Sequence, residues 1–177
     1  MHVPHVSIDD MASHTEITAN VNYAPEKVHA ALSDNAYWTY LAENMSTPAG
    51  EVLSFNNEGD RTEVEIKQIM STDSLPDAVK SLIKNDLVVV RKISWGPLAD
   101  DAAESTVTAE VNGMPVTFGG TQNLRAEGDG SAIVTGADVT VNVPMMGPVL
   151  EPKVAGAVDG LFQREAGLLQ DYLSKNA

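Results

Sequence analysis

Hydrophobic and polar residues alternate along most of the chain, with a period of two residues that is typical of half-buried strands. In His14–Tyr23, for example, Thr15, Ile17 and Val21 share one face with other apolar residues. Short turn sequences separate the later strands, which favours antiparallel neighbours. The six further predicted strands are Glu51–Asn56, Arg61–Met70, Leu87–Trp95, Glu104–Val111, Pro115–Ala126 and Ser131–Val143.

Two short helices are predicted between the first and second strands. Pro25 fits the first turn of a helix, because the N–H group that proline lacks would have no hydrogen-bond partner at that position. Ser33-Asp34-Asn35 ends this helix and can cap a second one over Tyr37–Glu43. A later segment, Leu75–Lys84, fits either a short amphipathic helix or an ordered loop.

The stretch Met146–Ser174 has the pattern of one long amphipathic helix. At about 100° per residue its apolar side chains fall within roughly 140° of arc, and at 1.5 Å per residue it is about 40 Å long. Pro148 suits a first turn, whereas Pro152 predicts that the ordered helix begins near Glu151. The apolar members are Leu150, Val154, Val158, Leu161, Phe162, Leu168, Leu169, Tyr172 and Leu173.

Two features of this helix are unusual. Glu165 lies near the middle of the apolar arc, and Gly156, Gly160 and Gly167 form a stripe on the opposite side. A glycine inside a helix costs about 1 kcal/mol relative to alanine. The stripe can be a tolerated solvent face. It can also mark close approach of another backbone, or a helix that shifts when a molecule enters beneath it.

These elements predict one α+β domain over residues 13–177, preceded by a loose leader at residues 1–12. A chain of this length buries roughly 70% of its unfolded surface as a single domain. A helix as long as Met146–Ser174 needs a broad apolar surface, and the apolar face of the antiparallel sheet offers one. We therefore expect the helix to cover that face.

The order of elements resembles the START-like superfamily, also called SRPBCC, Bet v 1-like or helix-grip. In that fold a curved seven-stranded antiparallel sheet wraps around a long C-terminal helix, and two short helices follow the first strand. The segments DLVVVRKISWGP (86–97) and VNGMPV (111–116) are similar to the bacterial family DUF2505. The resemblance implies the fold and a hydrophobic-ligand cavity between sheet and helix, but it does not imply an activity.

The composition and net charge of the chain limit the kinds of molecule that the protein is expected to bind. The chain has no cysteine, which excludes disulfides and thiolate sites and fits a cytoplasmic location. Its formal net charge of −14 opposes binding to nucleic acid and to anionic lipid surfaces. No apolar run is long enough to span a membrane, and no secretory leader is recognisable. We expect neither nucleic acid nor integral membrane association; the oligomeric state stays open.

Several polar residues fall on faces that are expected to point inward. A buried charge without a partner is costly, so Arg91 and Glu165 are expected to face each other across the sheet–helix space. This pair can be a structural ion pair or a polar anchor for a ligand, unless Arg91 lies outside. The polar candidates for ligand binding are Arg91, Glu165, Gln68, Gln122 and Thr135, and the apolar candidates are Trp95, Phe118, Val158, Phe162 and Leu169.

We therefore predict a soluble, non-enzymatic binder of a small hydrophobic or amphipathic, lipid-like molecule. No spacing of histidines or carboxylates predicts a metal site, and no cofactor is expected. One alternative is a cyclase- or hydrolase-type enzyme with Glu165 as general base and Arg91 stabilising negative charge. A second alternative is a protein-interaction module that uses the glycine stripe or the strand edges.

Overall fold

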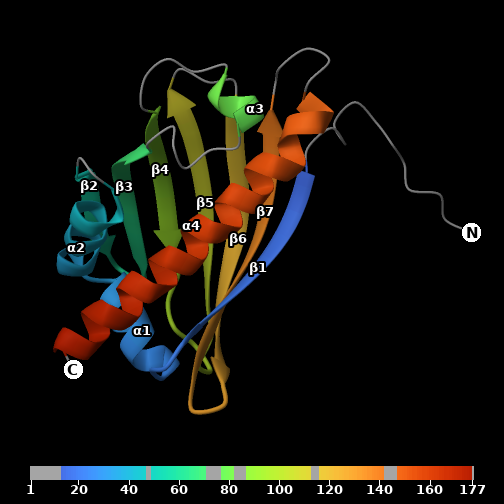
Figure 1. Ribbon diagram of the computed structural model, residues 1–177. Coiled ribbons are helices and arrows are strands. Elements are labelled where there is room, and N and C mark those ends of the chain that lie inside the picture. The colour runs from blue at the N-terminus through green and yellow to red at the C-terminus, as the bar shows by residue number, and fades with distance from the viewer. Residues whose placement is uncertain are drawn as a thin grey trace, which may run out of the picture.

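A curved antiparallel sheet of seven strands forms most of the protein (Figure 1). The computed structural model describes residues 13–46, 49–70, 77–81, 87–112, 116–141 and 147–176. The strand order is β1-β7-β6-β5-β4-β3-β2, so β1 and β2 are the two edges. The strands are β1 Ser13–Val21, β2 Glu51–Glu58, β3 Arg61–Met70, β4 Leu87–Trp95, β5 Ala103–Asn112, β6 Val116–Glu127 and β7 Gly130–Val141.

Two helices, α1 (Pro25–Leu32) and α2 (Asn35–Met45), connect the two edge strands. Asp34 caps α2, because its Oδ1 accepts a hydrogen bond of 2.9 Å from the backbone N–H of Ala36. A short helix, α3 (Asp77–Lys80), lies within the segment for which a helix or a loop was predicted. The α+β helix-grip fold is therefore confirmed. The predicted leader at residues 1–12 lies outside the described residues.

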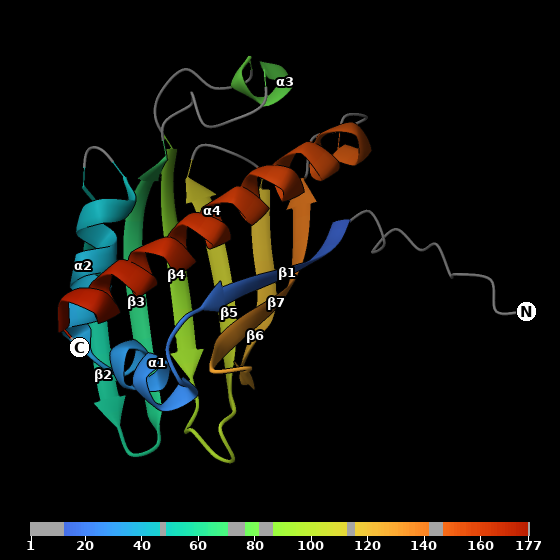
Figure 2. The ribbon, with the colours of Figure 1, turned by 60° about the horizontal axis from the view of Figure 1, so that its bottom comes forward.

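The last helix, α4 (Gly147–Asn176), runs diagonally across one face of the sheet (Figures 1 and 2). It contacts β1 and β7 of the sheet, as well as α1 and α2. Within the part of α4 whose side chains the structure describes, the buried residues are spaced four, three and four positions apart, as one face of a helix requires. They are Phe162, Ala166, Leu169 and Leu173.

The start of α4 differs from the sequence-based expectation of Glu151. The backbone is already helical at Gly147 and continues through Pro152. Pro152 removes only one backbone hydrogen bond, the one to the carbonyl oxygen of residue 148 in the first turn. A helix of thirty residues tolerates that loss.

The turns follow the expected residue chemistry at two places and depart from it at a third. Gly59 and Gly128 have positive φ angles of 63° and 57°, which glycine adopts without strain. Asp100 and Asp101 also have positive φ, at 54° and 60°, in a two-residue turn closed by hydrogen bonds between Ala99 and Ala102. This Asp-Asp turn was not predicted. The Asn112-Gly113 dipeptide, which is typical of hairpin turns, extends beyond the described residues.

Candidate functional site

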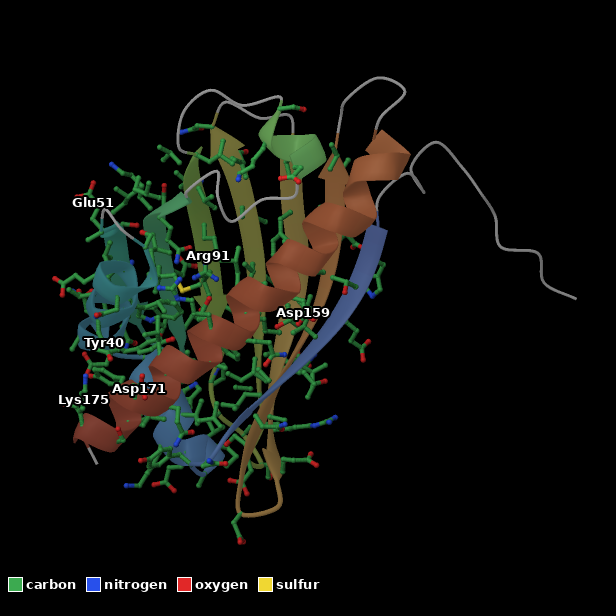
Figure 3. All side chains as sticks on the ribbon, viewed as in Figure 1. Tyr40, Glu51, Arg91, Asp159, Asp171 and Lys175 are labelled. Atoms are coloured by element: carbon green, nitrogen blue, oxygen red, sulfur yellow. The ribbon has the colours of Figure 1, made fainter. Side chains whose placement is uncertain are left out.

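An ion pair joins α4 to the middle of the sheet. Nη1 of Arg91, on β4, donates a hydrogen bond of 2.8 Å to Oε2 of Glu165, on α4. Only 8% of the Arg91 side chain and 15% of the Glu165 side chain are exposed. In the register of the sheet Arg91 lies between Ile66 of β3 and Ala109 of β5. Figure 3 shows its position between β4 and α4. The expectation that the two charges meet is confirmed, and Arg91 lies inside.

Two other nitrogens of Arg91 are buried without an acceptor among the described residues. They are Nε and Nη2. The guanidinium carbon lies 6.0 Å from the centre of the Phe162 ring, which itself lies 5.7 Å from the ring of Phe118. The guanidinium therefore lies beside the ring of Phe162 and one carboxylate, and the described residues offer no acceptor to its Nε and Nη2.

Tyr37 of α2 lies in the same electrostatic environment. Its ring packs edge-on against Trp38 at 5.0 Å and Tyr172 at 5.5 Å between ring centres. Burial raises the pKa of Tyr37 well above its ordinary value, the negative charge of Glu165 adds to this effect, and Arg91 opposes it. The hydroxyl group of Tyr37 therefore stays protonated at neutral pH and can donate a hydrogen bond.

A row of polar residues crosses the inner face of the sheet. Thr62, Trp95, Ser105, Gln122 and Thr135 occupy paired positions on five successive strands. All five are buried. Nε2 of Gln122 donates a hydrogen bond of 3.1 Å to Oγ1 of Thr135, whereas Nε1 of Trp95 has no acceptor among the described residues. We call these five residues the polar row.

A small cavity lies over the polar row, beneath α4. Its volume is about 30 Å³, about a tenth or less of the ≈ 300–1,000 Å³ of a typical ligand pocket. Apolar side chains form most of its wall, and polar atoms come from both the sheet and the helices. The lining residues are Ala19, Leu32, Tyr37, Trp38, Trp95, Gln122, Ile133, Thr135, Phe162, Glu165, Ala166 and Leu169.

The structure brings six of the ten candidate site residues to this cavity: Trp95, Gln122, Thr135, Phe162, Glu165 and Leu169. Four candidates lie elsewhere. Arg91 contacts the cavity wall through Glu165, and Phe118 contacts it through Phe162. Gln68 is half-buried beside Val89, and Val158 is half-buried one turn before Phe162. A ligand-binding role for any of the ten remains a prediction.

The sequence-based candidates did not include the contribution of α1 and α2. Leu32, Tyr37 and Trp38 complete one side of the cavity. The two adjacent aromatic residues were an available signal, because large aromatic side chains usually lie inside. Their position over the sheet depends on how the two helices pack, which the local pattern does not specify.

Two classes of feature are absent from the described part of the chain. It contains no group of three or more histidine, aspartate or glutamate residues that could hold a metal ion. Among its helices, none combines the length and the apolar character that a membrane crossing requires.

Solved structures of other proteins share this fold. TTHA0849 from Thermus thermophilus aligns with a TM-score of 0.59 and 16% identity, over 93% of this chain and 99% of that one. Ara h 8.0201 aligns with a TM-score of 0.56 and 15% identity, over 93% and 99% of the two chains. A conserved protein from Geobacillus kaustophilus gives 0.56 and 12%, over 92% and 96%. At these identities the likeness shows the fold alone.

Sequence comparison identifies relatives and a family. The uncharacterized protein Rv0481c of Mycobacterium tuberculosis is 24% identical over 168 residues, which are 91% of this chain and 97% of that protein. The model of the family described as "Protein of unknown function (DUF2505)" matches residues 16–173, nearly the whole of the described fold. The protein therefore belongs to the DUF2505 family.

Proposed function

We propose that this protein is a non-enzymatic binder of a small hydrophobic or amphipathic molecule, held between the sheet and α4. The observation that carries the proposal is the cavity over the polar row, whose mainly apolar wall includes Glu165, Tyr37 and Trp95. Ligand sites in proteins combine apolar walls with a few polar groups that fix orientation. The START-like fold, in which a sheet and a long helix enclose a ligand cavity, supports the same function.

The size of the cavity determines how binding would occur. A cavity of about 30 Å³ is too small for a lipid-like molecule, so the ligand must displace part of the wall. The C-terminal end of α4 is held against α2, since the ring of Tyr172 lies 5.5 Å from Tyr37 and 5.6 Å from Tyr40. We therefore expect the cavity to enlarge by movement of α4 about this aromatic contact.

Native mass spectrometry tests the proposal. The purified protein is measured before and after extraction with organic solvent, and again after incubation with a lipid extract. We expect a bound mass that is lost on extraction and regained on incubation. A protein that carries no added mass and takes up none from the extract would contradict the proposal.

A cavity-filling variant makes the test specific. Ala166→Leu adds three carbons to the cavity wall and should reduce the bound fraction, at a stability cost of about 1–3 kcal/mol from overpacking. Ala30→Leu is the matched control, because Ala30 is exposed on α1. Equal uptake by the two variants, both shown to be folded by circular dichroism, would place the ligand elsewhere.

A further inference from the structure

Three buried donor nitrogens of β4 side chains have no acceptor among the described residues: Nε and Nη2 of Arg91 and Nε1 of Trp95. The other tryptophan differs, because Nε1 of Trp38 donates a hydrogen bond of 2.9 Å to the carbonyl oxygen of Leu32. A buried donor without an acceptor is unfavourable. A molecule that supplied acceptors would therefore relieve this penalty when it bound.

The two nitrogens of Arg91 form one recognition edge. In a guanidinium group the N–H bonds of Nε and Nη2 point to the same side and can meet two oxygen atoms in one plane. Nη1 is already used by Glu165. The edge formed by Nε and Nη2, which we call the side edge of Arg91, is thus available to bind a ligand. The ion pair with Glu165 fixes the orientation of the guanidinium group.

The charge of the site restricts the chemistry of that acceptor. Arg91 and Glu165 contribute opposite charges, so together they are neutral. A ligand carboxylate would bring a second buried negative charge close to Glu165, within a chain of formal net charge −14. Uncharged acceptors such as carbonyl and ether oxygens have no such cost.

The donors lie at separate points along the site. Arg91 and Trp95 are four residues apart on the same face of β4, which places their Cα atoms about 13 Å apart at 3.3 Å per residue. Trp95 lines the cavity together with Tyr37 and Glu165, and Glu165 connects it to Arg91. A ligand that satisfies both ends needs more than one acceptor along an apolar body.

We infer that the ligand is an uncharged apolar molecule with two or more carbonyl or ether oxygens, recognised by the side edge of Arg91 and by Nε1 of Trp95. This inference rests on the proposed function and specifies the class of molecule bound. It separates that class from fatty acids and other anionic amphiphiles, and from hydrocarbons without acceptors.

Three fluorescent probes of similar size test the class. Prodan is a neutral naphthyl ketone, its propyl analogue (the propyl control) has a CH2 group in place of the ketone, and anilinonaphthalene sulfonate carries a negative charge. In titrations of the extracted protein we expect Prodan to bind about tenfold more tightly than either of the others, the factor that one or two hydrogen bonds provide.

Two variants test the residues. Arg91→Lys keeps a positive charge for Glu165 but removes the side edge, and Trp95→Phe keeps an aromatic ring but removes the N–H group. The single ketone oxygen of Prodan can meet only one of the two sites, so one of these variants should raise the Kd for Prodan about tenfold, and neither should change the Kd for the propyl control. Arg61→Lys is the matched control for Arg91→Lys, because Arg61 is exposed and bonds to Ser94.

The outcomes separate this inference from the proposed function. If the propyl control or the sulfonate binds wild-type protein as tightly as Prodan, the inference is wrong while the binding function stands. The inference is also wrong if Prodan binds Trp95→Phe and Arg91→Lys with the wild-type Kd. If no probe binds, both proposals fail. If Arg91→Lys does not fold, the comparison of the three probes on wild-type protein still decides the inference.

Discussion

At the scale of single residues, the ion pair between Arg91 and Glu165 has an asymmetric effect on stability. Glu165→Gln leaves the buried charge of Arg91 without a counter-charge, which should lower the free energy of unfolding by about 3 kcal/mol. The double variant Arg91→Met/Glu165→Leu removes both charges and should stay within about 1 kcal/mol of wild type. Urea unfolding of both proteins measures these values. A loss in the double variant as large as in Glu165→Gln would contradict the asymmetry.

Tyr37 predicts how stability depends on alkaline pH. Its pKa is raised by burial and by Glu165, so the folded protein keeps a proton that the unfolded chain releases above about pH 10. The contribution of Tyr37 is therefore fully present below pH 10 and decreases as the pH rises from there towards the folded-state pKa. Unfolding measured from pH 8 to 11 should show a smaller alkaline loss in Tyr37→Phe than in wild type.

Tyr172→Phe is the comparison for Tyr37→Phe. The pKa of Tyr172 is also raised, by burial and then by Asp34, but Tyr172 is only half-buried whereas Tyr37 is fully buried. The alkaline loss should therefore respond less to Tyr172→Phe. An identical pH profile for wild type and Tyr37→Phe would show that Tyr37 does not control this loss.

The Asp100-Asp101 turn has an unfavourable backbone conformation. Left-handed φ angles cost about 1–2 kcal/mol for most L-residues, somewhat less for aspartate, and turns of this kind prefer glycine at the second position. Asp101→Gly should raise the free energy of unfolding by about 0.5–1 kcal/mol. Asp129→Gly, in a turn where the aspartate φ is not positive, should give no gain. Equal thermal melting shifts for the two variants would refute the prediction.

At the scale of elements, the glycine stripe of α4 is a solvent face. Gly156, Gly160 and Gly167 are exposed, and no described atom outside the helix's own backbone lies within 4 Å of the Cβ that a larger residue would add. This favours a solvent face over close approach of another backbone, since no other backbone in the described part of this chain approaches the stripe. The three glycines nevertheless weaken the helix, because each adds conformational freedom to the unfolded chain.

Gly160→Ala should therefore stabilise the protein by about 0.5–1 kcal/mol. Ala166→Gly at a buried position of the same helix should destabilise it by at least about 1 kcal/mol, through lost helix propensity and lost packing. Thermal unfolding followed by circular dichroism compares them. If Gly160→Ala proved neutral or destabilising, the stripe would have a structural partner.

At the scale of the whole molecule, the fold was predictable because each element has one buried face. The alternation of Ile17, Ala19 and Val21 in β1 and the spacing of Phe162 and Leu169 in α4 are local consequences of that burial. The bounds of β3 and β4 agree with the prediction. The sequence did not predict the turn at Asp100-Asp101, because aspartate alone does not specify a positive φ angle. It also did not predict the start of α4 at Gly147, because the position of a proline alone does not determine where a helix begins.

The site was predictable only in part, because it depends on register. Periodicity placed Arg91, Gln122 and Thr135 on inner faces, and the cost of an unpaired charge predicted that Arg91 meets Glu165. That Trp95 and Gln122 occupy the same row follows only from the pairing of three strands with one another. Local sequence patterns carry no information about that alignment.

The net charge of −14 predicts a dependence of stability on salt. Repulsion among like charges is greater in the compact state, and raising the ionic strength from about 0.01 M to 0.15 M shortens the screening length from about 30 Å to 8 Å. The melting temperature should therefore rise between these conditions. Equal ionic strengths of NaCl and KCl should give the same rise, and a constant or falling melting temperature would count against net repulsion.

The strand order also has a consequence for how the chain is made. β1 is the first strand of the described chain, yet its partner is β7, with Ile17 opposite Thr135. During synthesis on the ribosome, β1 therefore stays unpaired until β7 has also been made. Polar residues alternate with the apolar residues of β1: they are Glu16, Thr18 and Asn20. We expect these polar side chains to lower the tendency of unpaired β1 to aggregate.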